Sequence, residues 1–348
     1  MYKRNVLVTG GAGFIGCNFV NFYLEKNESD AVVVLDNLTY AGNKANLNAV
    51  SDNANFRFEY GDIRDQQRVE RLLRENEINV IVHFAAESHV DRSISGPDVF
   101  IETNIVGTHA LLKAARQVWI EEGLFPTAHR FHHVSTDEVY GSLGPEDPSF
   151  TEETAYAPNS PYSASKAASD HLVRAYHRTY GLCTTVSNCS NNYGPYQHDE
   201  KLIPTVVRQA LRGQAIPIYG TGSNVRDWLY VMDHCRAIDA ILDRGMVGEV
   251  YNVGGGMECD NVTLAKHVCA RVDELIADSP ELQSRYPKCL VNRGLQSESL
   301  IEFVPDRAGH DFRYSINSEK IHKTLSFSPE ASFAESLRQT VLFLLQRG

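Results

Sequence analysis

The stretch "NVLVTGGAGFIG", residues 5–16, joins a run of apolar, β-branched residues to a glycine-rich turn. Its glycines satisfy the spacing GxGxxG through Gly11, Gly13 and Gly16, and also GxxGxxG through Gly10, Gly13 and Gly16. Glycines at these positions permit a tight turn and let backbone N–H groups approach a pyrophosphate at a helix N-terminus. The stretch therefore predicts a strand, a phosphate-binding loop and a helix in succession.

An acidic residue ends the next predicted strand. Asp36 follows the run "AVVVL" (31–35) and lies twenty residues after Gly16, where a carboxylate can bind the ribose hydroxyls of an adenosine. A glycine-rich turn alone is often purely structural, but the two linked features together predict a dinucleotide site. The segment "DNLTYAGN" (36–43) contains no arginine or lysine, and the next cation is Lys44. NAD is therefore favoured over NADP, because Asp36 would repel a 2′-phosphate.

The same alternation of strand and helix continues through the first half of the chain. Apolar, β-branched runs predict strands at 5–9, 31–35, 56–60, 79–84 and 130–135, with helical patterns between them. Such alternation implies right-handed βαβ units, and so an α/β fold of the Rossmann type with a doubly wound parallel sheet. Beyond residue 190 the pattern loosens, with weaker strand signals at 227–231 and 249–255.

This change of pattern predicts two domains. We expect an NAD-binding domain at 1–190, to which the chain returns near 228–256, and a smaller substrate domain mainly within 191–348. The segment 275–300 is too weakly patterned to assign elements.

Composition and charge restrict the partners of the protein. The net charge of −11 argues against non-specific binding to nucleic acid or to a membrane surface, which needs positive charge. The seven cysteines show no CxxC pair and no metal-ligand spacing, so we expect reduced, mostly buried thiols and no metal site. Two basic residues precede the first apolar run, but glycines interrupt that run and no long apolar run follows. These features predict a cytoplasmic protein.

The segment "SPYSASKAASDHLVRAYHRTYG" (160–181) carries clear helix signals and a candidate catalytic pair. Ser160 is a good N-cap, Pro161 fits the first helical position, and Gly181 fits the stop. Tyr162 and Lys166 lie four residues apart, hence on one face of the helix. An ammonium near a phenol stabilises the phenolate and lowers the phenol pKa, which makes the tyrosine a general base for a substrate hydroxyl.

The spacing YxxxK alone is weak, because a solvated tyrosine and lysine on a helix surface are the ordinary case. Its position after the fifth predicted strand of a dinucleotide fold favours the catalytic interpretation, with Thr136 upstream as a hydroxyl partner.

Two adjacent carboxylates follow that fifth strand in "STDEVYG" (135–141). Asp137 and Glu138 either lie in a solvated, capped turn or supply an acid and a base to one site. Successive residues of a regular strand point to opposite faces of the sheet. Both side chains can therefore reach one ligand only if the strand breaks near Thr136.

The motifs as a set resemble the dTDP-glucose 4,6-dehydratase family, a nucleotide-sugar branch of the extended short-chain dehydrogenase/reductases. A nucleotide-sugar epimerase would share the glycine loop and YxxxK, but not the Asp-Glu pair after "ST". The resemblance spans residues 5 to about 315 and is carried by "DNLTYAGN" (36–43), "AAESHVDRSI" (85–94), "STDEVYG" (135–141), the helix 160–181, "NCSNNYGPYQ" (188–197), "KLIP" (201–204) and "RDWLYVMDH" (226–234).

This resemblance implies a lyase that uses NAD and regenerates it in every cycle. Tyr162 removes the C4 hydroxyl proton while the C4 hydride goes to NAD, and the resulting ketone acidifies the C5–H. Glu138 then takes the C5 proton, and protonated Asp137 donates to the departing C6 hydroxyl. Water leaves, the hydride returns to C6 and C5 is reprotonated, which gives a 4-keto-6-deoxy sugar.

The resemblance also implies the residues of the site. Catalysis falls to Thr136, Asp137, Glu138, Tyr162 and Lys166. The residues expected at NAD are Gly10, Gly13, Phe14, Ile15, Gly16, Asp36, Asn37, Leu38, Thr39, Asp62, Ile63, Phe84, Ala85, Ala86, Ser88, Thr103, Tyr162, Lys166 and Asn192. The residues expected at the sugar nucleotide are Glu87, Thr136, Asn191, Lys201, Leu202, Pro217, Arg226, Asn261, Asp306, Arg307 and His310.

The chain departs from the family pattern in "DRAGHDFRY" (306–314), where Ala308 replaces the usual proline and Phe312 a frequent charged residue. Arg226 is the best physical candidate for a diphosphate, because guanidinium binds phosphate bidentately. A homodimer is a further family expectation, supported by the small residues Ala164, Ala167 and Ala168.

Three functions stay open at this stage. The first is the dTDP-glucose dehydratase, or a related dehydratase of UDP- or CDP-glucose, because the choice of base rests on resemblance alone. The second is a nucleotide-sugar 4-epimerase or a simple dehydrogenase. The third is a non-catalytic, NAD-binding regulator on the same fold.

Overall fold

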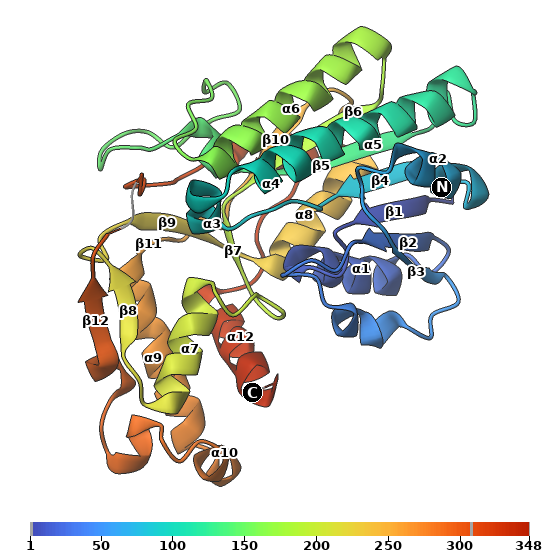
Figure 1. The fold of residues 1–348 in the computed structure, drawn as a ribbon. Coiled ribbons are helices and arrows are strands. Elements are labelled where there is room, and N and C mark those ends of the chain that lie inside the picture. Colours follow the sequence, from blue (N-terminus) through green and yellow to red (C-terminus); the bar gives the residue numbers. More distant parts are fainter. Residues whose placement is uncertain (1–2, 307–308, 348) are drawn as a thin grey trace.

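The computed structural model describes residues 3–306 and 309–347, and Figure 1 shows their arrangement. Within these residues seven parallel strands form one sheet, in the order β10-β6-β5-β4-β1-β2-β3. The strands are β1 (Asn5–Thr9), β2 (Ala31–Asp36), β3 (Phe56–Tyr60), β4 (Val80–His83), β5 (Arg130–Thr136), β6 (Thr184–Cys189) and β10 (Val250–Val253). The α/β class and the five strands expected in the first half are confirmed.

The strand order reverses between β1 and β4, because the chain moves outward from β1 to β3 and then resumes on the other side of β1. Loops that leave the carboxyl ends of strands on the two sides of such a point diverge and open a crevice. The glycine loop follows β1, so this topology places it at the mouth of that crevice.

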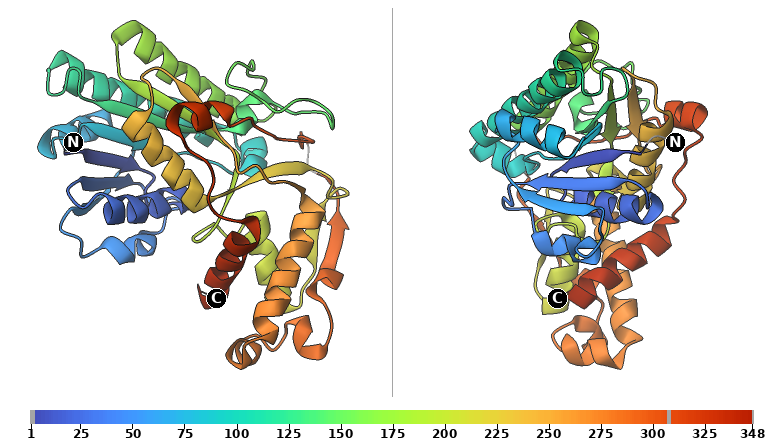
Figure 2. Two further views of the ribbon diagram at one scale, coloured as in Figure 1. Left: turned by 180° about the vertical axis from the view of Figure 1, so that it is seen from behind. Right: turned by 90° about the vertical axis from the view of Figure 1, so that its right-hand side faces the viewer.

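Helices cover both faces of the sheet (Figures 1 and 2). Val6 and Val8 of β1 pack in a core with α1 and α8, whereas Leu7 packs with α2, α5 and α6 on the opposite face. This alternation is what a strand buried on both sides requires. The helices are α1 (Phe14–Lys26), α2 (Gln66–Glu75), α5 (Thr108–Ala115), α6 (Pro161–Tyr180) and α8 (Val231–Arg244).

Shorter turns of helix connect these elements. They are η1 (Lys44–Val50), α3 (Val90–Ser95), α4 (Asp98–Phe100), the π-helical turns η2 (Ile101–Gly107) and η3 (Arg116–Glu121), and the 3₁₀ turn η4 (Asp137–Tyr140). Because η4 begins at Asp137, strand β5 ends at Thr136, which confirms the break that the Asp-Glu pair requires.

Helix α6 has the ends that its sequence predicts. The Ser160 hydroxyl accepts from the N–H of Ser163, whose own hydroxyl accepts from the N–H of Ser160. Pro161 occupies the first turn, and Gly181 ends the helix with a left-handed φ of 73°. This double cap fixes where the helix starts. It therefore fixes the position of Tyr162 in the first turn and that of Lys166 one turn later.

A second group of elements packs around its own apolar core below the sheet in Figure 1. It contains a three-stranded sheet, β11-β9-β7, and a β12-β8 pair. Its elements are β7 (Asn191–Tyr193), α7 (Leu202–Arg212), β8 (Ile216–Tyr219), β9 (Val225–Tyr230), β11 (Glu258–Asp260), α9 (Asn261–Ala277), α10 (Pro280–Arg285), η5 (Leu290–Arg293), η6 (Ser297–Leu300), β12 (Ile301–Val304) and α12 (Phe333–Arg347). Helix α11 (Glu319–Leu325) packs instead on α8 and β10 of the large sheet.

Strands β9 and β10 coincide with the two weaker strand patterns. The segment 275–300, unassigned from its pattern, forms the end of α9, then α10, η5 and η6. The division into two domains stays a prediction. None of the described helices is both long and apolar enough to cross a lipid bilayer.

Candidate active site

A cavity of about 740 Å³ opens at the carboxyl ends of the central strands. Its wall includes the glycine loop after β1, the loops after β2, β3 and β4, the end of β5, the start of α6 and residues of β7, β8 and β9. The large sheet and the smaller group of elements therefore both contribute to one cavity. Of the residues expected at the cofactor and at the substrate, most line it.

The glycine loop is packed so closely that side chains would not fit at two positions. A Cβ on Gly16 would lie 2.3 Å from the Gly10 carbonyl oxygen, and one on Gly10 would lie 2.6 Å from the Ala85 nitrogen. Gly10 also has a left-handed φ of 71°. Gly13 precedes α1, and no side chain caps the first turn of this helix within the described residues. The first-turn amides therefore suit a pyrophosphate, which fits NAD.

Asp36 organises the loop that follows the glycine turn. Its carboxylate accepts from the backbone N–H of Ala12 at 2.9 Å and from that of Leu38 at 2.8 Å, and it lines the cavity. Burial raises the pKa of this carboxyl, while the two backbone hydrogen bonds lower it. The donors hold an acceptor at the end of β2, where a ribose hydroxyl would bind.

The part of the cavity beside Asp62 carries a cation that was not predicted from the sequence. Arg64 lines the cavity beside Asp62, and it forms ion pairs with Asp62 at 2.8 Å and with Glu102 at 2.5 Å. Since two carboxylates contact this guanidinium, it does not present an isolated charge to a 2′-phosphate. The sequence did not indicate a role for Arg64, because an arginine in a turn is ordinarily solvated.

A buried asparagine fixes the loop after β4. The Asn104 side chain accepts from the N–H of Glu87 at 2.8 Å and donates to its carbonyl at 3.0 Å. It also donates to the Ser165 hydroxyl at 2.8 Å, which ties the loop to α6. Asn104 lies in the π-helical turn η2 and was not predicted. A polar residue on the buried face of a helix was the feature that could have identified Asn104 from the sequence.

Tyr162 and Lys166 lie one turn apart on α6, and both are buried and line the cavity. The Lys166 ammonium donates to the Val134 carbonyl at 2.8 Å. The sequence predicts a lowered pKa for the Tyr162 phenol, and this prediction is wrong. Burial and the nearby carboxylate of Glu138 raise the pKa of Tyr162 well above its ordinary value, although a hydrogen bond with Thr136 opposes them.

The two adjacent carboxylates occupy different environments. Glu138 lines the cavity, whereas Asp137 is 2% exposed and lies behind the lining. Burial, together with Glu138 and Asp227, raises the pKa of Asp137 well above its ordinary value. Burial therefore favours the protonated, neutral form of Asp137. One strand break thus places a buried carboxyl group next to a carboxyl group on the cavity wall.

The expected substrate residues come from both groups of elements. Arg226 is 5% exposed, stacks on Tyr314 at 4.3 Å, and donates to the backbone carbonyls of Asp311 and Phe312. Arg226 lines the cavity, and these contacts hold its guanidinium in a fixed orientation. The other expected substrate residues on the lining are Glu87, Thr136, Asn191, Lys201, Leu202, Pro217, Asn261 and His310.

Four expected residues are not found on the lining. Leu38 packs into the core of the α1 and α8 face, because its backbone turns there with a φ of 49°. Asp137 lies behind the wall. Asp306 contacts His310 at 2.6 Å rather than the cavity. Arg307, with Ala308, lies outside the described residues.

One charged cluster at the cavity was not expected at all. Glu200 lies 3.4 Å from His89, 3.4 Å from Arg92 and 3.6 Å from His198, and the Arg92 guanidinium stacks on Tyr40. Its members come from three loops that are far apart in the sequence. No local pattern could bring them together.

Comparison with known proteins agrees with this geometry. The matching family model is that of GDP-mannose 4,6 dehydratase, over residues 7–340. A dTDP-glucose 4,6-dehydratase of Neisseria meningitidis is 50% identical over 346 residues, which cover 98% of this chain and 93% of that protein.

Solved structures show the same relationship. A dTDP-glucose 4,6-dehydratase from Streptomyces venezuelae, solved with NAD bound, has a TM-score of 0.86 at 46% identity and covers 98% of this chain and 97% of its own. A UDP-glucose 4-epimerase from Thermotoga maritima has a TM-score of 0.82 at 28% identity, with 99% of each chain covered. The resemblance of the motifs is confirmed, and the chain belongs to the dTDP-glucose 4,6-dehydratase family.

Proposed function

We propose that the protein converts dTDP-glucose into dTDP-4-keto-6-deoxyglucose and water, with one bound NAD that is regenerated in each cycle. The observation that carries this proposal is the pair at the end of β5. Buried Asp137, whose protonated form is favoured, and Glu138 on the cavity wall lie near Tyr162. A dehydrogenase needs only the tyrosine and the lysine, so an acid and a base next to them indicate an elimination.

Oxidation at C4 relies on α6 and the end of β5. NAD, when bound, supplies the acceptor for the C4 hydride and its later donor to C6. Tyr162 accepts the C4 hydroxyl proton, and the Lys166 ammonium stabilises the phenolate that precedes this step. Burial disfavours the phenolate, so a nearby cation has to stabilise it. Lys166 lies one turn away on the same helix face, where it can do so. Thr136 hydrogen-bonds Tyr162 and so orients its oxygen.

Elimination relies on the two carboxyl groups. The C4 ketone acidifies the C5–H, and Glu138 on the cavity wall takes that proton. Asp137 gives its proton to the C6 hydroxyl, which leaves as water. Glu138 then returns a proton to C5. The general acid and the general base are thus supplied by neighbouring residues with different exposure, and each contributes about 10²–10⁴-fold to the rate.

The fold itself does not separate this function from epimerisation, because the Thermotoga maritima epimerase matches nearly the whole chain. The dehydratase and the epimerase are distinguished by their products. Incubation of the purified protein with dTDP-glucose, followed by NMR, is expected to show a 4-keto-6-deoxy sugar. A galacto product would identify an epimerase, and bound NAD without turnover would identify a regulator. Parallel reactions with UDP- and CDP-glucose measure the choice of base.

Three further features belong to this proposal. The protein acts in the cytoplasm, its domains divide near residue 190, and it forms a homodimer. Exposed apolar side chains on η2, which packs against α6, support the dimer, since Ile101 and Val106 are 44% and 50% exposed and α6 itself carries exposed Ala164. Sedimentation equilibrium of the wild type and of Val106→Glu tests it. A monomeric wild type would exclude the dimer.

A further inference from the structure

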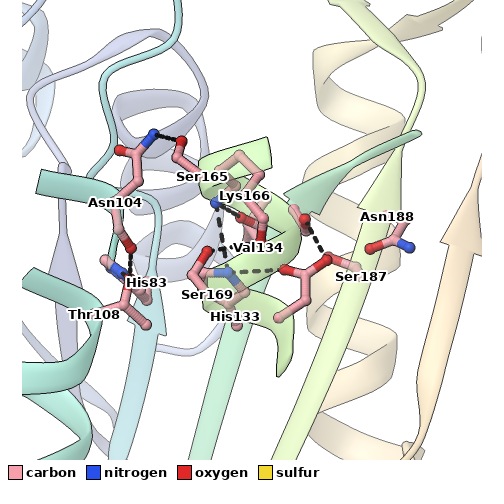
Figure 3. A network of polar contacts seen from close by, with 12 residues as sticks. His83, Asn104, Thr108, His133, Val134, Ser165, Lys166, Ser169, Ser187 and Asn188 are labelled. Carbon is pink, nitrogen blue, oxygen red and sulfur yellow. Dashed lines mark hydrogen bonds and ion pairs between the residues drawn. The ribbon is translucent and has the colours of Figure 1, made fainter. Parts of the chain in front are cut away.

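Tyr162, Lys166 and Asp170 recur every four residues along α6 and form one buried stripe. Lys166 is 4% exposed and Asp170 is 5% exposed. The Lys166 ammonium contacts the Val134 carbonyl at 2.8 Å and the His133 ring at 3.5 Å (Figure 3). A buried ammonium requires a counter-charge, because desolvation otherwise favours its neutral form.

Asp170 is held in place from three directions. Its Oδ1 lies 3.1 Å from His133 Nε2, and its Oδ2 accepts from the hydroxyls of Ser135 at 2.8 Å and Tyr156 at 3.0 Å. His133 Nε2 therefore lies between the carboxylate and the Lys166 ammonium. Nε2 can accept from the ammonium or donate toward the carboxylate, but one nitrogen cannot do both, so Asp170 acts on Lys166 by its charge across this ring atom.

The other titratable groups around Lys166 are neutral at neutral pH. Burial lowers the pKa of His83 and of His133 well below their ordinary value and raises the pKa of the Cys189 thiol to about 12. Tyr162 has a raised pKa, as described above. Burial raises the pKa of Asp170 only to about 6, so this carboxyl is ionised at neutral pH. Asp170 is thus the negative charge that faces Lys166 from within this network.

We propose that Asp170 is a positioning residue whose negative charge, facing Lys166 beside the His133 ring, keeps this lysine protonated and correctly placed beside Tyr162. Asp170 is absent from the described cavity lining, so it acts on the reaction through the lysine rather than through substrate or cofactor. The proposal rests on the proposed function, because it assigns Asp170 to the oxidation step that Tyr162 and Lys166 carry out. It extends the pair YxxxK to a triad YxxxKxxxD on one helix face.

The test compares Asp170→Asn, which removes the charge, with Tyr156→Phe, which removes one hydrogen bond to Asp170 and leaves the charge. We expect Asp170→Asn to move the alkaline limb of kcat about one pH unit toward neutrality, because Lys166 then loses its proton earlier. The KM for dTDP-glucose stays within about twofold, since no substrate contact changes. Tyr156→Phe is expected to leave the limb in place.

A direct readout does not depend on turnover. In protein labelled with ¹³C at lysine Cε, the Lys166 signal, assigned with Lys166→Arg, is expected to titrate at lower pH in Asp170→Asn than in the wild type. Asp170→Glu keeps the charge and is expected to restore both the titration and the alkaline limb. Should Asp170→Asn not fold, Asp170→Ser removes the same charge with a smaller side chain and carries the same expectation.

The outcomes separate this inference from the proposed function. An Asp170→Asn enzyme with an unchanged alkaline limb and an unchanged Lys166 titration overturns the inference, even if its thermal stability falls. Wild-type protein that does not turn over dTDP-glucose overturns the proposed function. Full activity of Lys166→Met would remove the lysine from the mechanism and the inference with it.

Discussion

The Thr136 hydroxyl donates a hydrogen bond to Asp137 Oδ1 at 3.3 Å, and the same Thr136 oxygen accepts from the backbone N–H of Glu138 at 3.3 Å. One residue at the end of β5 therefore holds the Asp137 carboxyl group and the backbone of Glu138. Asp137 Oδ2 is buried and has no hydrogen-bond partner among the described residues, so it is the oxygen suited to carry the proton. The structure thus separates an acid from a base across one peptide bond.

Replacement of Asp137 by asparagine removes the acid and leaves the shape of the side chain. We expect Asp137→Asn to retain oxidation at C4 and to form the 4-keto-6-deoxy product at least about 10²-fold more slowly, since a general acid contributes at least that much. Rapid-mixing absorbance of the reduced nicotinamide, with product measured by NMR, follows the two steps separately. Loss of both steps to the same extent would argue that Asp137 supports oxidation instead.

Replacement of Glu138 by glutamine tests the base. In deuterated water the wild type is expected to place solvent deuterium at C5 of the product, because Glu138 exchanges its proton before returning it. Glu138→Gln should still oxidise C4 but lose elimination and C5 exchange by about 10²-fold or more. Normal dehydration by this variant would contradict the assignment. Glu146→Gln, at an exposed turn, is the matched control.

The glycine loop predicts a steric effect. In Gly16→Ala the new Cβ would meet backbone atoms, with the Gly10 oxygen at 2.3 Å, so the loop must shift. We expect a loss of about 1–3 kcal/mol in the free energy of unfolding and a preparation depleted of NAD. Gly96→Ala is the control, because its nearest neighbour, the Arg92 oxygen, lies at an ordinary 3.8 Å. Urea unfolding and the NAD content of purified protein measure both effects.

The raised pKa of Asp170 predicts a dependence of stability on pH. Its carboxyl titrates at about 6 in the folded protein, mainly because of burial, against an ordinary value of 3.8. Between these values the folded state binds the proton and the unfolded state does not, so this contribution to stability falls as pH rises and is fully lost above about 6.

Relative to Asp170→Asn, the wild type should therefore lose about 2 kcal/mol of unfolding free energy between about pH 4.5 and 7.5, which is the part of the full effect of about 3 kcal/mol that lies above pH 4.5. Urea unfolding of both proteins across this range measures the difference. A constant difference between the two curves would show that Asp170 has an ordinary pKa in the folded state.

Much of the fold followed from local patterns. The strand ends at Thr9, Asp36 and Thr136 lie within one residue of their predicted positions, because β-branched runs and the residues that stop them are neighbours in the sequence. Helix α6 was bounded correctly, because its caps are local too. The π-helical turn that holds Asn104 was not predicted, since its hydrogen-bond partners belong to a distant loop and to α6.

The site was predictable where motifs are local and unpredictable where groups meet in space. The glycine loop and the Tyr162–Lys166 pair were found from their spacing. The direction of the Tyr162 pKa was predicted wrongly, because burial cannot be read from YxxxK. The groups around Glu200, and the contact of His133 with Asp170, join separate segments and gave no signal in the sequence.

The central claim is that a hydride leaves C4 and returns to C6 of the same sugar. Incubation with dTDP-glucose that carries deuterium at C4 and ¹³C at C1, mixed with substrate that carries neither label, and NMR and mass analysis of the product test it most directly. We predict deuterium at C6 of a 4-keto-6-deoxy sugar only in the molecules that carry ¹³C. Deuterium retained at C4 of a galacto product, or a product without deuterium at C6, would contradict the account.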